Sequence, residues 1–352
     1  MDPAALIPSP DTIPVAWGWF EFFLLVTFAC HLLLMNALLG GAVLALFGGR
    51  PPQGPGAELA KRLPTTLALT VNLGVPPLLF LQVLYGQFLY SAAVLSAVYW
   101  MLLVVVVMVS YGLLYVHAGR AKRGLFGGPA GLPLPLAVGG LLLTSFILTN
   151  VMSLMVRPEA WSQYFFNARG TILNLGDPTL LPRWLHFVFA SLAGGGLFVA
   201  ALNHRAQGSD QHAASRVRRG MKWFSVASLV QVGIGLWWLL TLPREIMLLF
   251  MGGNTLYTAV FVAGLIGTVA ILVMGFSGRV WGSVGALVAT VLVMVGMRDL
   301  LRMAYLKPYF HPSTLEVTGQ YGSLVLFLVS FAAGLGGIAY MFSLHRKAGG
   351  GI

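Results

Sequence analysis

Nine stretches of this chain are each long and apolar enough to cross a lipid bilayer, and this pattern limits the possible folds more than any other feature. An α-helix needs about 20 apolar residues to span the hydrocarbon core. A transmembrane β-strand would instead alternate apolar and polar residues, which these stretches do not. We therefore predict membrane-spanning helices over residues 18–47, 66–90, 94–117, 132–156, 182–202, 222–243, 255–276, 280–298 and 321–344.

The composition excludes a soluble fold. Hydrophobic residues make up 58% of the 352 residues and charged residues only 9%, whereas soluble domains carry about 25% charged residues. No basic residue precedes the first apolar stretch, so we expect that stretch to belong to the mature protein and not to a cleaved signal peptide. The sequence thus predicts an all-α integral membrane protein.

The basic residues are unevenly distributed between the loops. Fourteen of the 21 lysines and arginines lie in alternate loops, which hold only the acids Glu58 and Asp210. Because basic loops remain in the cytoplasm, this pattern predicts an outer N-terminus and a cytoplasmic C-terminus, as nine crossings require. The net charge of +11 is explained by this topology, and we expect no nucleic-acid partner.

The chain contains signs of an internal duplication. His31 is followed nine residues later by Gly40, and His186 is followed nine residues later by Gly195. The second helix of each half carries a related polar and glycine-containing segment, at residues 72–75 and 231–235, which matches Gly74 with Gly233. Both halves would begin on the outer side, so we predict parallel repeats.

The resulting organisation has five parts. A first four-helix bundle is expected over residues 1–156 and a second over 182–298. Outer loops are expected over 157–181 and 299–320, and the ninth helix with a cytoplasmic tail over 321–352.

Two of the seven histidines lie inside predicted membrane helices. An imidazole in hydrocarbon is unfavourable unless something there bonds to it, so His31 and His186 have either a structural or a functional role. The duplication favours function. The other five histidines are expected at helix ends, in loops or at the membrane surface: His117, His204, His212, His311 and His345.

The surroundings of the two histidines favour haem over a bare metal ion. No acidic residue accompanies either histidine, although a metal site or a proton relay would need further ligands or carboxylates. A haem needs one imidazole and a second axial group. Arg183 lies three residues before His186 on the same helix face, where it would hold a haem propionate or anchor the helix at the interface. For the glycines alone, close helix packing is the favoured explanation.

The segments around these histidines resemble a known family. Residues 177–186, with proline second and Arg183 three places before His186, resemble the start of the fifth helix in the large subunit of cytochrome bd quinol oxidases. Residues 31–40 are similar to the first helix of that subunit, and residues 73–86 to its second. The resemblance implies two four-helix bundles plus one helix, a prokaryotic inner membrane, and haem ligation by His31 and His186.

The chain departs from that family where oxygen is reduced. The family's third helix carries glutamates for oxygen and proton chemistry, and residues 97–109 contain none. By the resemblance, Met294 replaces a glutamate haem ligand, while residues 261–264 lack the family's methionine ligand. The quinol-binding loop is reduced to residues 243–254. Methionine is a competent axial ligand, so the sequence favours a cytochrome that is not an oxygen reductase.

The sequence therefore leads to one main hypothesis and two alternatives. The main hypothesis is a b-type cytochrome with one or two haems, held by His31, His186 and Met294, with Arg183 and Arg298 at the propionates. It would carry electrons between quinol and an extracytoplasmic acceptor such as a c-type cytochrome, as the quinol-oxidising subunit of a membrane complex. The alternatives are a haem-free membrane anchor or assembly subunit of a respiratory complex, and a transporter built from parallel repeats.

Overall fold

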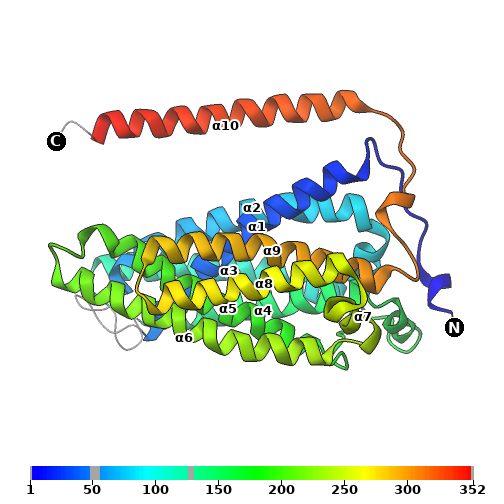
Figure 1. Cartoon of the computed structure of the whole chain (residues 1–352), viewed down its shortest axis with the longest axis horizontal. Coiled ribbons are helices and arrows are strands. Elements are labelled where there is room, and N and C mark those ends of the chain that lie inside the picture. Colours follow the sequence, from blue (N-terminus) through cyan, green and yellow to red (C-terminus); the bar gives the residue numbers. More distant parts are fainter. Residues whose placement is uncertain (1, 48–55, 126–130, 350–352) are drawn as a thin grey trace.

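The computed structural model describes residues 2–47, 56–125 and 131–349, and within them nine helices are long and apolar enough to span a membrane. The chain runs back and forth along the long axis of the molecule, with its termini at opposite ends (Figure 1). We call the end that carries the N-terminus the N-side. The prediction of an all-α membrane protein is confirmed. The long helices are α1 (Trp17–Phe47), α2 (Gly56–Leu95), α3 (Ala97–Lys122), α4 (Pro133–Met155), α5 (Leu180–Asn203), α6 (Gln211–Thr241), α8 (Thr255–Phe276), α9 (Val280–Leu306) and α10 (Tyr321–Gly349).

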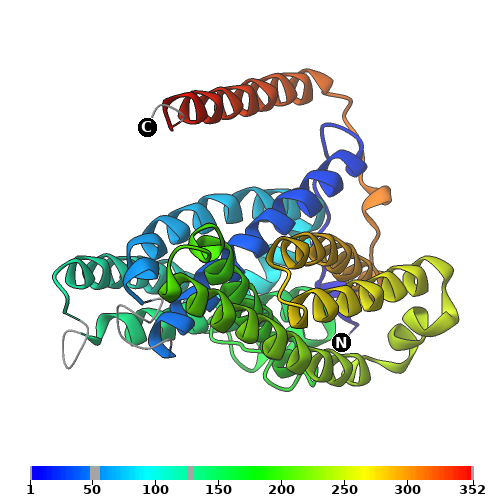
Figure 2. The ribbon, with the colours of Figure 1, turned by 60° about the vertical axis from the view of Figure 1, so that its left-hand side comes forward.

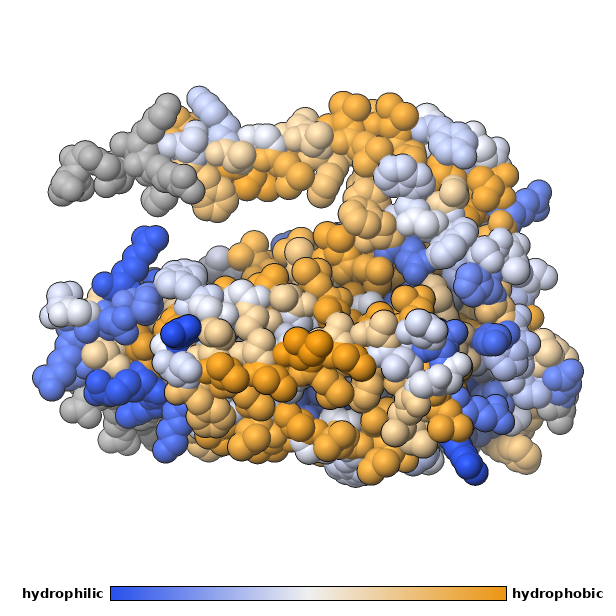
Figure 3. All heavy atoms as spheres, in the orientation of Figure 1, coloured by the Kyte–Doolittle hydropathy of each residue, from blue (hydrophilic) through white to orange (hydrophobic). Residues whose placement is uncertain are grey.

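Several short helices precede α1 or lie between the long helices. On the N-side they are the 3₁₀-helices η1 (Pro3–Leu6), η3 (Pro158–Phe165) and η6 (Pro312–Thr314), together with α7 (Arg244–Leu248) and the π-helical η5 (Leu249–Gly253). At the opposite end, η4 (His204–Ala206) connects α5 to α6. Hydrophilic residues gather at both ends of the molecule and apolar residues cover its middle (Figure 3), which matches a bilayer environment.

Several helices extend beyond their predicted ends, and two of these extensions, in α6 and α9, show why. The helix predicted to start at 222 begins at Gln211, where the Asp210 side chain accepts a hydrogen bond from the His212 amide and caps the helix. The helix predicted to end at 298 continues to Leu306, through a stretch placed in the outer loop by hydropathy. Asp299 and Arg302 form an ion pair inside this extension, so its charges are buried and its polarity does not end the helix.

The second helix leaves helical geometry at one position. Pro76 and Pro77 lie within α2, where each removes a backbone hydrogen bond, yet the backbone stays helical at both. The α2 backbone leaves helical geometry at Tyr85 (φ −135°, ψ 29°), beside Gly86, and the helix then continues to Leu95. The bend therefore lies on the N-side, about two turns beyond the prolines.

The centre of the bundle is the crossing of α1 and α5, and each of these helices also packs along its successor, α2 or α6. At the crossing, a Cβ added to Gly40 would overlap the Ser191 carbonyl, and one added to Gly195 would overlap the Gly40 backbone. The Ser191 hydroxyl donates a hydrogen bond to Asn36 Oδ1 (3.0 Å) one turn away. The two glycines thus serve helix packing, which is the explanation favoured from the sequence.

The loop over residues 157–181 is tied to the N-side by a buried polar cluster around Asp177. Its carboxylate forms an ion pair with Arg157 (3.0 Å), accepts the Thr179 amide (2.9 Å) and accepts the Ser153 hydroxyl of α4. These contacts place the start of α5. In contrast, α10 stands apart from the other helices (Figures 1 and 2), and its Phe327 and Phe331 rings lie 5.2 Å and 6.2 Å from that of Phe23 on α1, measured between centroids.

Candidate functional site

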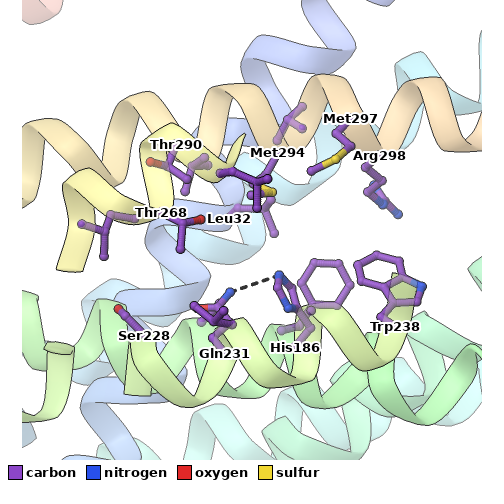
Figure 4. A pocket seen from close by; sticks show the side chains of 18 of the residues that line it. Leu32, His186, Ser228, Gln231, Trp238, Thr268, Thr290, Met294, Met297 and Arg298 are labelled. Carbon is purple, nitrogen blue, oxygen red and sulfur yellow. Dashed lines mark hydrogen bonds between the residues drawn. The ribbon is translucent and has the colours of Figure 1, made fainter. Parts of the chain in front are cut away.

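A cavity of about 240 Å³ lies between α5, α6, α8 and α9, with α1 along one side. Most of its wall is apolar, and the cavity is partly open to the surface of the bundle. Figure 4 shows that α5 and α6 supply one wall and α9 the opposite wall. The side chains that carry chemistry on these walls are His186, Gln231, Trp238, Met294, Met297 and Arg298.

His186 projects from α5 into this cavity (Figure 4). Its Nε2 lies 3.1 Å from the side-chain nitrogen of Gln231 on α6. Its Nδ1 is buried and has no hydrogen-bond partner among the described residues. A Cβ at Gly235 would lie 3.3 Å from the His186 Cε1, so the absence of a side chain there makes room for the ring.

Met294 faces the cavity from α9, across from His186 (Figure 4). Gly264 on α8 stands behind it, and a Cβ at Gly264 would lie 3.1 Å from the Met294 methyl carbon. Met297 lies one turn further toward the N-side and also lines the cavity. A nitrogen donor and a sulfur donor thus occupy opposite walls of one apolar cavity.

Two arginines lie at the N-side end of the cavity. Arg183 is buried, and its guanidinium carbon lies 5.5 Å from the centroid of the Trp238 ring. The guanidinium carbon of Arg298 lies 4.3 Å from the centroid of the Phe28 ring. Within residues 2–47, 56–125 and 131–349, neither arginine forms a salt bridge, and Arg183 Nε has no hydrogen-bond partner. Since an unpaired buried charge is unfavourable, this pair favours an anionic group at the cavity end.

The neighbouring arginines differ because they already have carboxylate partners. Arg157 pairs with Asp177, and Arg302 pairs with Asp299. A small second cavity of about 30 Å³ is lined by Arg183, Arg298 and Arg302. The positive charge that remains to be balanced therefore lies with Arg183 and Arg298.

His31 does not line the main cavity. Its Nδ1 lies 3.0 Å from the Thr70 carbonyl oxygen of α2, and a Cβ at Gly74 would lie 2.8 Å from its Cε1. Its ring stacks on Phe28 with 6.4 Å between centroids, and Arg298 covers that same phenylalanine. The structure therefore brings His186, Met294 and Arg298 onto one cavity, with Arg183 at its end, and leaves His31 beside it.

Sequence reasoning missed two contacts of His186, one with the Gln231 side chain and one with the Trp238 ring, whose centroid lies 5.6 Å from that of the imidazole. Gln231 and Trp238 were not proposed as site residues, although Gln231 lies in the segment that resembles residues 72–75. The predicted match of Gly233 with Gly74 was also wrong, because the glycine that contacts the histidine in the second half lies two residues later, at Gly235. Gly235 meets His186, whereas nothing in the described part of the chain would lie within 4 Å of a Cβ at Gly233.

The structure also corrects the position expected for His117. We expected an interfacial side chain, but His117 is buried near the end of α3. Neither ring nitrogen has a hydrogen-bond partner among the residues that the structure describes. Hydropathy could not reveal this burial, because it results from packing of α3 against its neighbours.

The main cavity is suited to a flat, mostly apolar ligand with anionic substituents. Across the described ranges, no three His, Cys, Asp or Glu side chains converge to hold a bare metal ion. One imidazole and one thioether on opposite walls are the axial ligand pair of many haem proteins. Paired arginines are suited to carboxylate groups, so the residues present fit a haem with its propionates. No protein-family model, curated protein or solved structure matches this chain.

Proposed function

We propose that the chain is a b-type membrane cytochrome whose haem occupies the cavity between His186 and Met294. The observation that carries this proposal is the placement of an imidazole and a thioether on opposite cavity walls (Figure 4), beside two arginines without carboxylate partners in the described residues. His186 would supply the axial nitrogen and Met294 the axial sulfur. Arg183 and Arg298 would hold the propionates. When bound, haem supplies reversible one-electron transfer.

The chain's own residues suit electron carriage better than oxygen chemistry. If haem is held by both His186 and Met294, these two side chains would occupy the ligand positions that an oxygen reductase leaves open. A thioether ligand raises the reduction potential, and the apolar wall formed by residues such as Leu236, Leu239 and Val291 excludes water. The described wall of this cavity also carries no carboxylate that would deliver protons directly to oxygen.

The wider function follows from the resemblance to the large subunit of cytochrome bd oxidases and from the basic loops. We infer a prokaryotic inner-membrane protein with the N-side outside and two parallel repeats that meet at Gly40 and Gly195. Electrons would pass between quinol in the bilayer and an outer acceptor such as a c-type cytochrome, in a membrane complex. His31 would ligate a second haem, which is supported by its bond to the Thr70 carbonyl, because such bonds orient ligating histidines.

The test is the haem content of the purified protein, measured as a pyridine haemochrome. We expect protein-bound haem b, which His186→Ala abolishes at the main cavity. Met294→Leu should retain haem but shift it to a high-spin spectrum, since one axial ligand is lost. Met101→Leu is the matched control, because Met101 is exposed on α3. A colourless wild-type protein would overturn the proposal and support the alternative of a haem-free anchor subunit.

A further inference from the structure

A second polar cluster lies on the N-side between α1, α2 and α9. The carboxyl group of Glu21 on α1 faces that of Asp299 on α9 within hydrogen-bonding range. Asp299 also pairs with Arg302. The guanidinium carbon of Arg302 lies 4.9 Å from the centroid of the Tyr85 ring of α2. The function proposed above uses none of these four side chains.

The hydrogen-bonding groups of this cluster do not balance. Two ionised carboxylates accept hydrogen bonds and cannot donate one to each other. Glu21 Oε2 is buried and has no hydrogen-bond donor among the described residues. The Tyr85 side chain is only 1% exposed, and its electrostatic neighbours are Arg302, Asp299 and Glu21. The contact between Glu21 and Asp299 is therefore short of one proton if both groups are ionised.

The charges lead to the same conclusion. Arg302 neutralises one of the two carboxylates, that of Asp299. A second negative charge on Glu21, in contact with the first at low dielectric, would be unfavourable. The other ionisable side chains that act on Asp299 from outside the cluster are Arg298 on α9 and Tyr257 on α8. Arg298 is turned toward the ring of Phe28, so its guanidinium is not the partner of Glu21.

We propose that Glu21 and Asp299 share one proton and that this carboxyl pair is a proton-exchange site of the bundle. Glu21 lies four residues inside α1, about 6 Å from its first residue, so protons exchange with water on the N-side. Asp299 adjoins Arg298, which lines the main cavity. An electron added in that cavity would hence favour proton uptake at the pair. This last consequence rests on the proposed function, whereas the shared proton does not.

The test is carbodiimide labelling of the whole purified protein with dicyclohexylcarbodiimide, which reacts with protonated carboxyl groups in apolar surroundings. Mass spectrometry should locate the label on Glu21 at neutral pH, and alkaline buffer should reduce it. Asp299→Asn should lower Glu21 labelling on the order of tenfold, because Arg302 then favours the ionised glutamate. Glu316→Gln is the control, since Glu316 is exposed, and it should leave the label unchanged.

Infrared spectroscopy gives a second readout that depends on neither labelling nor haem. Wild-type protein should show the carbonyl band of a protonated carboxyl group at neutral pH, and Glu21→Gln should remove it. Glu21→Gln keeps the Asp299–Arg302 ion pair, so folding is preserved. Labelling of Glu21 no stronger than that of Glu316, or a band that persists in folded Glu21→Gln protein, would overturn the proposal. A colourless protein that shows both signals would refute the proposed haem site but support the proton-exchange site.

Discussion

Gly40 and Gly195 meet backbone against backbone where α1 crosses α5. Each lies nine residues after a histidine, His31 or His186. Two positions with the same spacing from a histidine therefore meet at the crossing. The same close approach brings Phe28 and Leu32 of α1 to the cavity that His186 enters. The packing of two glycines therefore decides which helices line the candidate haem site.

A side chain at this crossing should destabilise the protein. Gly40→Ala places a Cβ into the Ser191 carbonyl, so the helices must separate. We expect a loss of about 1–3 kcal/mol, measured by thermal unfolding in detergent followed by tryptophan fluorescence. Gly139→Ala on α4 is the control, because nothing in the described structure lies within 4 Å of its added Cβ. An equal melting temperature for both variants would contradict close packing at Gly40.

Removal of the Asp177 carboxylate should loosen the start of α5. Asp177→Ala leaves Arg157 without its ion-pair partner and the Thr179 amide without its acceptor. Breaking a buried ion pair in this way costs about 3 kcal/mol. The same unfolding assay should show the loss, together with faster proteolysis of the loop over residues 157–181. Asp11→Ala, at an exposed position, should change neither.

Neutral substitutions of the two cavity arginines should lower the haem reduction potential. Arg183→Gln or Arg298→Gln removes a positive charge that disfavours the oxidised iron. We expect a decrease on the order of tens of millivolts in a redox titration followed by absorbance. Arg244→Gln is the control, because Arg244 is exposed on α7. Unchanged potentials in both cavity variants would mean that the propionates lie elsewhere.

The two histidines should differ in their effect on the spectrum. His31→Ala should leave the His186–Met294 haem intact, because His31 does not line that cavity. We expect His31→Ala to remove the proposed second haem and to lower the haem content per chain, measured as a pyridine haemochrome, without changing the low-spin signal. Loss of the low-spin signal in His31→Ala would contradict the assignment of His186 and Met294 to one haem.

Alkaline pH should weaken the contact between the loop that follows α9 and the 3₁₀-helix η3. The hydroxyl of Tyr309 donates a hydrogen bond to Glu159 (2.7 Å), and burial, that bond and the glutamate charge raise the pKa of Tyr309 to about 12. A raised pKa means that the folded state favours protonated tyrosine. Its stabilising contribution is therefore complete below about pH 10, the ordinary tyrosine value, and is lost as the pH rises toward 12.

This pH effect can be measured by a tyrosinate absorbance titration. Glu159→Gln should lower the Tyr309 pKa, because it removes the negative charge beside the hydroxyl. Tyr309→Phe should remove one high-pKa transition from the titration and reduce the alkaline loss of stability. An identical titration curve for wild-type and Tyr309→Phe protein would contradict the assignment.

Hydropathy located the helices well but not their ends. Asp299 and Arg302 were assigned to a loop because charged residues normally end an apolar stretch, whereas here they neutralise each other inside α9. The pair of Glu21 with Asp299 was consequently not anticipated. Burial of charged residues depends on which partners the fold supplies, and partners on other helices leave no local signal.

The composition of the chain determined that its long helices span a membrane. The isolated imidazoles of His31 and His186 marked the positions where a side chain in hydrocarbon requires a bonding partner. Both are local properties, since the free energy of placing a side chain in hydrocarbon depends mainly on that side chain. Packing settled which residues face each other. Met294 lies opposite His186, Gln231 rather than a carboxylate meets the ring, and His31 lies outside the cavity. These relationships depend on how closely α1 and α5 approach each other at Gly40 and Gly195. They also depend on how α6 and α9 are rotated about their own axes. Neither property is encoded in a single segment of the sequence.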